Sequence, residues 1–288
     1  MARASLCAMI HRGDPWLASC AAVLFAACHG APAPVSDANT LDPARIVVET
    51  PSAGPAAPAL AARAPAIDLP AGWKSAGREA FERLLETSLP SNVPHSFTST
   101  ALSELTQALQ GADESAVRAV AWLARADDAR ASELLLGRLE QRRSLSAEAN
   151  GPASAIDVAA AAALDPSATT RDVAARLEAL VAGKKSHPAL DVRVECARVA
   201  LHAGRDGVIV FLLSVLRTGT TLIGARLDAT AVQSATELDW CQTRAAQALA
   251  LRAGLPPRFR SAAPLAERER ALQELEAALV PRRADKTP

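Results

Sequence analysis

The sequence predicts an all-α fold, a right-handed α-solenoid of about five helical pairs. Three observations carry this prediction. From residue 72 onward, apolar residues recur with the spacing of amphipathic helices. One short segment returns along the chain at intervals of about 40 residues, the period of stacked helical pairs. Hydrophobic residues make up 50% of the chain, mostly Ala, Leu and Val, which favour packed helices.

The first helical pair is predicted ahead of the recurring segment. In REAFERLLETSL (78–89), Phe81 and Leu85 lie on one helical face, and prolines then break the chain. In STALSELTQALQG (99–111), Leu102 and Leu105 begin a second apolar stripe. The two segments together predict a helical hairpin.

The recurring segment is predicted to be the first helix of each later pair. It begins with a residue suited to N-capping, has alanine at the sixth position after that residue, and ends with leucine. The small alanine allows neighbouring helices to approach closely, so we expect the final leucines (Leu123, Leu164, Leu201 and Leu249) to be buried. The segments are DESAVRAVAWL (113–123), SAIDVAAAAAL (154–164), DVRVECARVAL (191–201) and DWCQTRAAQAL (239–249).

A second predicted helix follows each of these segments. The first helices carry arginines and are expected to be partly exposed, whereas DGVIVFLLSVL is almost uncharged and is expected to lie between neighbours. The second helices are predicted at 130–141, 171–183, 206–216 and 264–279.

The stretch DVRVECARVALHAG (191–204) resembles a HEAT repeat, with its Asp-x-Arg opening and alanine-rich middle. The resemblance covers about residues 75 to 280 and implies HEAT-like pairs stacked into a solenoid. It also implies a structural ladder of polar residues between repeats, in which Arg118 and Arg244 take part. The segment SAIDVAAAAAL departs from the pattern because it lacks the arginine.

Residues 1–28 are predicted to be an export signal. The apolar stretch 16–27 follows basic residues and is shorter than the roughly 20 residues that span a bilayer. It ends in LFAAC, which resembles a bacterial lipobox with Cys28 as the lipid attachment site, although Phe25 replaces the usual leucine. We therefore expect a lipoprotein of the cell envelope, periplasmic or associated with the outer membrane. Simple secretion and an unprocessed cytosolic chain are the alternatives.

The segment 29–71 is predicted to be a disordered tether. Proline recurs throughout it, and no helical or strand period is sustained. Such a tether would hold the solenoid of residues 72–281 away from the membrane. Residues 282–288 are expected to form a flexible tail.

Several polar residues have structural interpretations. Asp113, Ser154, Asp191 and Asp239 are expected to be helix N-caps. Cys196 and Cys241 are expected to be buried thiols, with a disulfide between them as the alternative in an exported protein.

Histidines and sequence motifs give no indication of a metal or catalytic site. His95 and His187 flank prolines and are expected in solvated loops. No H-E-x-x-H, C-x-x-C, G-x-S-x-G or G-x-G-x-x-G motif occurs. We therefore expect no catalytic residue, no metal and no cofactor.

The charge balance argues against nucleic acid, because 31 basic residues are matched by 31 acidic residues. We expect a non-enzymatic scaffold that binds a protein or peptide. Its predicted binding face consists of arginines on or just after the second helices, namely Arg138, Arg142, Arg143, Arg176 and Arg217. The insertion 218–238, which lengthens the third repeat interval, is the alternative binding surface. An enzyme on a HEAT-like scaffold, as in phycobilin lyases, and a purely structural envelope protein are the other functions considered.

Overall fold

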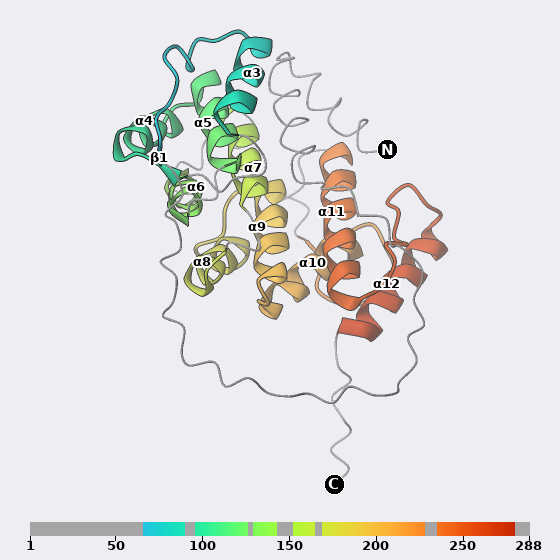
Figure 1. Ribbon diagram of the computed structural model, residues 1–288. Helices are drawn as coiled ribbons and strands as arrows, with labels where there is room; N and C mark the ends of the chain where they lie inside the picture. Colours follow the sequence, from blue (N-terminus) through green and yellow to red (C-terminus); the bar gives the residue numbers. More distant parts are fainter. Residues whose placement is uncertain are drawn as a thin grey trace, which may run out of the picture.

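The computed structural model describes residues 66–89, 96–125, 129–142, 152–164, 169–227 and 235–279. These residues are mostly α-helical, in agreement with the predicted all-α class. Figure 1 shows the helices following one another in sequence order, from α3 and α4 at one side of the molecule to α12 at the other.

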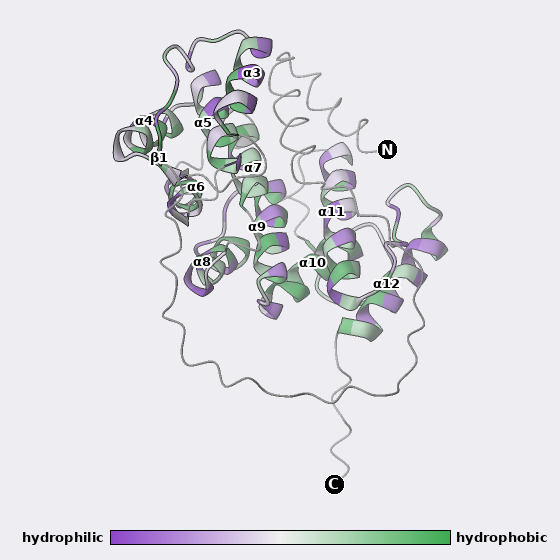
Figure 2. Cartoon of the chain, viewed as in Figure 1, coloured by the Kyte–Doolittle hydropathy of each residue, from purple (hydrophilic) through white to green (hydrophobic). Residues whose placement is uncertain are grey.

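The helices lie where the periodicity of the sequence predicts them, although several of them begin or end at other residues than predicted. Most helices carry both hydrophobic and hydrophilic residues along their length, as Figure 2 shows. The helices are α3 (Arg78–Ser88), α4 (Ser99–Leu109), α5 (Glu114–Arg125), α6 (Ala129–Arg142), α7 (Pro152–Ala163), α8 (Arg171–Val181), α9 (Leu190–His202), the 3-10 turn η1 (Asp206–Val208), α10 (Ile209–Arg217), α11 (Ala235–Ala253) and α12 (Leu265–Leu279).

A short parallel strand pair lies at the start of the described chain. In it β1 (Ala66–Ile67) pairs with β2 (Ser96–Phe97). The buried Trp73 follows β1, and its indole N–H donates to Glu104 of α4 over 3.3 Å. Residues 66–71, which the sequence places in the tether, therefore belong to the folded part.

The helices pack in two rows. In one row α5 contacts α7, α7 contacts α9 and α9 contacts α11. In the other, α4 contacts α6, α6 contacts α8, and α10 contacts α12. The rows meet through the pairs α4–α5, α6–α7, α8–α9 and α10–α11, and the hydrophobic core lies between them.

The recurring positions of the sequence all lie in this core. The leucines that end the four segments are buried, which confirms the prediction: Leu123, Leu164, Leu201 and Leu249. The alanines at the sixth position are each 0% exposed, as close helix packing requires: Ala119, Ala160, Ala197 and Ala245.

Two helices of the first row end in the same way. Gly204 after α9 has φ 84°, and Gly254 after α11 has φ 65°, a backbone region that glycine enters without steric cost. The next N–H reaches back to the helix in both, from Arg205 to the carbonyl of Ala200 and from Leu255 to that of Ala250, each over 2.9 Å. Both ends have the bonds of a Schellman motif.

The exposure expected for the first helices is wrong for α5 and α9. Residues 116–123 of α5 are buried throughout, and α9 is buried along nearly its whole length. The physical reason is that α9 packs against α7, α8, α10 and α11. Its acidic residues Asp191 and Glu195 are therefore buried, whereas Arg193 and Arg198 are partly buried.

The predicted helix starts are correct at one of the four segments. Asp113 caps α5, where its Oδ1 accepts from the N–H of Ser115 over 3.1 Å. Hydrogen bonding to the carboxylate, with Ser115 first, lowers the pKa of Asp113. Ser154, Asp191 and Asp239 lie inside their helices, because α7, α9 and α11 begin earlier than capping preference alone predicts.

Candidate partner-binding surface

Arg138 does not belong to an exposed basic face. Its side chain is 2% exposed, and its Nε lies 2.8 Å from Oδ1 of the equally buried Asp157 on α7. Its guanidinium also donates to the carbonyls of Leu109 and Gly111 at the end of α4. The residue joins α4, α6 and α7, and its assignment to the binding face is corrected.

Arg176 lies partly exposed on α8, where carboxylates of α6 surround it. Its guanidinium lies 2.8 Å from Glu140 and 2.6 Å from Glu133. The hydrogen bonds that the Arg176 guanidinium donates to Glu140 are the main reason that the pKa of Arg176 is raised above its ordinary value. Its charge is therefore matched within the protein.

Arg217 forms a similar ion pair between α10 and α12 of the second row. It ends α10 and lies 2.8 Å from Glu276 of α12. Arg142 is the last residue of α6, and the side chain of Arg142 and the whole of Arg143 lie outside the described residues. Arg138, Arg176 and Arg217, the members of the predicted face whose side chains are described, thus join neighbouring helices, and their charges are matched by carboxylates.

The described part of the insertion, residues 218–227, is fixed to α12 by polar contacts. The N–H of Thr221 donates to Glu269 over 2.7 Å, and the guanidinium of Arg268 donates to the carbonyl of Gly219 over 3.2 Å. Gly224 has φ 143°, a backbone conformation that other residues rarely adopt, and a Cβ there would lie 2.6 Å from the Arg217 guanidinium, which would have to shift. These contacts with α12 order the described part of the loop.

An isoleucine lies at the outer side of this loop. Ile223 is 97% exposed, whereas the adjacent Leu222 packs against the core. Among the described residues, the other large exposed hydrophobic side chains are on helices: Val210, Leu251 and Leu265.

Glu195 is the centre of a buried ion-pair cluster that joins α9 to α11. Its carboxylate is 0% exposed and lies 2.7 Å from Arg198 and 2.5 Å from Arg244. Burial opposes its ionisation, but the two guanidiniums hold the pKa of Glu195 below its ordinary value. Arg198 also donates to the carbonyl of Ala162 on α7, over 3.4 Å.

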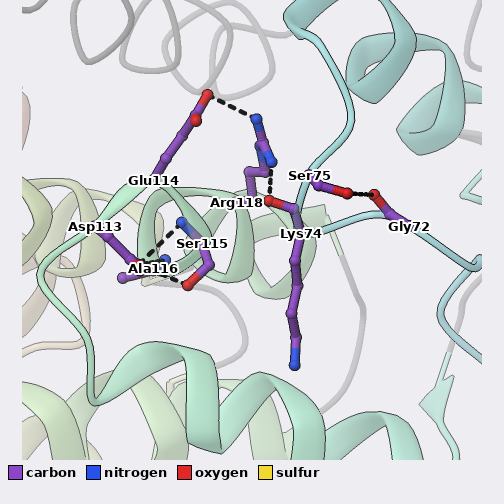
Figure 3. A network of polar contacts seen from close by, with 8 residues as sticks. All are labelled: Gly72, Lys74, Ser75, Asp113, Glu114, Ser115, Ala116 and Arg118. Carbon is purple, nitrogen blue, oxygen red and sulfur yellow. Dashed lines mark hydrogen bonds and ion pairs between the residues drawn. The ribbon is translucent and has the colours of Figure 1, made fainter.

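Arg118 makes a comparable link at the start of the array. Figure 3 shows its side chain between Glu114 and the backbone of Lys74, the residue after Trp73. The guanidinium lies 2.6 Å from Glu114 and donates to the Lys74 carbonyl. It also lies over the ring of Phe81, with 5.6 Å to the centroid. Arg118 therefore ties α5 to the segment before α3.

The carboxyl of Asp191 is buried between helices. It accepts from the N–H of Val192 over 2.8 Å. Burial, with a smaller contribution from the charges of Glu237 on α11 and Asp157 on α7, raises the pKa of Asp191 to about 7. The periodicity of the sequence gave no sign of this site, because Asp191 had a sufficient explanation as an N-cap.

His187 is buried, which corrects its assignment to a solvated loop. The connection between α8 and α9 folds inward, and the backbone N–H of His187 donates to the carbonyl of Leu180 over 2.8 Å. Its Nδ1 accepts from the N–H of Ala189, and its Nε2 lies 3.9 Å from Asp157. His95 lies outside the described residues.

Both cysteines of the repeat region are buried thiols, as predicted. Burial raises the pKa of the Cys196 thiol and that of the Cys241 thiol well above the ordinary value. Thiolate is the reactive form, so neither side chain is suited to nucleophilic chemistry in this state. No disulfide joins them.

No group of His, Cys, Asp and Glu side chains in the described part of the chain could hold a metal ion. None of the described helices is long and apolar enough to cross a membrane. Comparison with protein-family models, curated protein sequences and solved structures gives no match for this chain.

Proposed function

We propose that this protein is a non-enzymatic, protein-binding scaffold of the bacterial cell envelope. In this proposal a right-handed solenoid of about five HEAT-like helical pairs is attached to the membrane through a lipid on Cys28. The observation that carries it is the row α5–α7–α9–α11, in which each helix packs on the next. Stacks of this kind expose a long surface and serve as binding platforms.

Three features support the solenoid arrangement. The alanines and leucines at recurring positions are buried at equivalent places in the first-row helices. Two of these helices end in the same Schellman motif. The outer side of α12, with Glu267, Arg270 and Glu274 exposed, is polar, as expected of a terminal repeat that covers the core.

We place the partner contact on the described part of the insertion rather than on the arginines. Arg176 and Arg217 are matched by carboxylates, so they give little net charge to a partner. Ile223, in contrast, is held fully exposed on a loop that α12 already orders, so binding would lose little conformational entropy there. The partner that fits is a protein or peptide with an apolar pocket, and its binding depends only weakly on salt.

Site-specific photocrosslinking in intact cells tests this proposal. A photoreactive residue at position 223 is expected to capture a defined partner, whereas one at position 251 is the matched control, since Leu251 is 69% exposed on α11. Ile223→Asp should abolish co-purification of that partner, and Leu251→Asp should not.

Two results would redirect the proposal. Capture from position 251 and not from 223 would place the binding surface on α11. Absence of any partner from either position would favour a purely structural envelope protein.

A further inference from the structure

Three arginines of the first-row helices α5, α9 and α11 each lie over an aromatic ring. Such a contact attracts the guanidinium electrostatically and restricts its orientation. The distances from the guanidinium carbon to the ring centroid are 5.6 Å for Arg118 and Phe81, 4.7 Å for Arg193 and Phe211, and 5.9 Å for Arg244 and Trp240. The same local arrangement therefore occurs on three helices of one row.

Arg193 differs from the other two arginines in its charge balance. Arg118 lies 2.6 Å from Glu114, and Arg244 lies 2.5 Å from Glu195. Among the residues that the structure describes, Arg193 contacts a backbone carbonyl and a ring but no carboxylate. Burial, with no opposing negative charge, lowers the pKa of Arg193. Its positive charge is therefore not neutralised by an acidic side chain of these residues.

The guanidinium of Arg193 is fixed on one side and open on the other. Its Nε donates to the carbonyl of Val181 at the end of α8 over 2.7 Å. A carbonyl at a helix end carries only a partial negative charge, so it holds the guanidinium without neutralising it. Arg193 is only partly buried, and its two terminal nitrogens have no acceptor within the described part of the chain. Paired N–H groups in one fixed plane are the donors that bind a carboxylate in bidentate fashion.

The connection after α8 adds positive charge on this side of the protein. It starts directly after Val181 and carries Lys184 and Lys185, which are both exposed. The acidic Glu178, about one turn earlier on α8, is already matched by Arg205 at 2.5 Å. A small ligand that approaches the guanidinium from solvent therefore meets cations, which favours an anion.

We propose that Arg193 is the centre of an anion-binding site that receives a carboxylate of a peptide, as Arg118 receives that of Glu114. The two carboxylate oxygens accept from the terminal N–H groups of Arg193. The Phe211 ring and the Val181 carbonyl hold the guanidinium in place for them. A C-terminal carboxylate or an acidic side chain supplies this chemistry. The site does not involve Ile223 and is independent of the proposed function.

Binding of synthetic peptides to the full chain tests the site. The probes are acetylated trialanine with a free C-terminal carboxylate, the same peptide as its C-terminal amide, and acetyl-Ala-Glu-Ala amide. Each is titrated at low salt and millimolar concentration by isothermal calorimetry. We expect the neutral amide not to bind and at least one carboxylate peptide to bind, and the one that binds identifies the source. Failure of both carboxylate peptides, or equal binding of the neutral amide, would overturn the proposal.

Three variants test whether Arg193 carries this binding. Arg193→Gln should weaken it at least roughly tenfold, because hydrogen bonds between two charged groups are lost. Arg193→Lys keeps the charge but not the paired N–H groups, and it should also bind more weakly. Arg260→Gln is the matched control, since Arg260 is exposed in the connection before α12 and the same charge is removed. Wild-type affinity in Arg193→Gln, or an equal loss in Arg260→Gln, would refute the assignment.

Chemical modification of the wild-type protein avoids any effect of these substitutions on folding. Phenylglyoxal reacts with accessible guanidiniums, and mass spectrometry of digested protein gives the rate at each arginine. The carboxylate peptide that binds should slow modification of Arg193 and leave the rate at Arg260 unchanged. Equal rates at Arg193 with and without the peptide would show that the carboxylate binds elsewhere.

Discussion

Replacing Arg138 by methionine is expected to destabilise the fold strongly. The substitution keeps an unbranched, apolar side chain but removes the guanidinium that lies 2.8 Å from Asp157. It leaves the Asp157 carboxylate buried beside α6 without its cation, and the carbonyls of Leu109 and Gly111 without this donor. Removing one member of a buried ion pair costs about 3–5 kcal/mol of unfolding free energy.

This cost corresponds to a loss of roughly 6–20 °C in melting temperature, since each kcal/mol is worth about 2–4 °C at this chain length. Urea unfolding followed by far-UV circular dichroism measures the loss of unfolding free energy. Arg78→Met is the control, because the pair Arg78–Glu82 is exposed on α3 and such pairs contribute below about 1 kcal/mol. A loss in Arg138→Met no larger than in the control would refute the interior role of Arg138.

Three other predictions concern the core, the anchor and the cysteines. Leu164→Ala removes a side chain that is 1% exposed and should cost about 2–5 kcal/mol in the same urea assay. Cys28→Ser should move the protein from the membrane to the soluble fraction, and identical soluble fractionation of both forms would exclude the anchor. Cys196 and Cys241 are buried, so a thiol reagent should modify them only after denaturation, whereas rapid labelling of the native protein would contradict their burial.

Much of the helical organisation could be predicted because it depends on periodic apolar residues. The repeated alanine and final leucine identify the side of each first-row helix that faces its neighbours, and Ala160 and Leu164 are buried as the pattern requires. Helix starts were predicted less well, as α11 shows. Capping residues such as Asp239 also occur inside helices when a neighbour supplies a partner, here the Ser261 hydroxyl.

The positions of the arginines could not be predicted in the same way. An arginine near the end of a helix has the same sequence pattern whether it faces solvent or a carboxylate on the next helix. A signal for Arg138 was nevertheless present, because it lies three residues after the buried Leu135 and one before the buried Leu139. A charged residue on an apolar stripe indicates a buried partner, and Asp157 occupies the same kind of position on α7, between Ile156 and Val158.

The pairing of the arginines also bears on how such a scaffold would bind. Along the second row, Arg176 lies 2.8 Å from Glu140 of the preceding helix, and Arg217 lies 2.8 Å from Glu276 of the following one. In these pairs each arginine is neutralised by a glutamate on a neighbouring helix of the row. This pairing is consistent with the zero net charge of the chain. A partner that depended on these arginines would have to displace carboxylates already in place. A partner that used Ile223 would displace only water, which is why we propose the insertion as the contact.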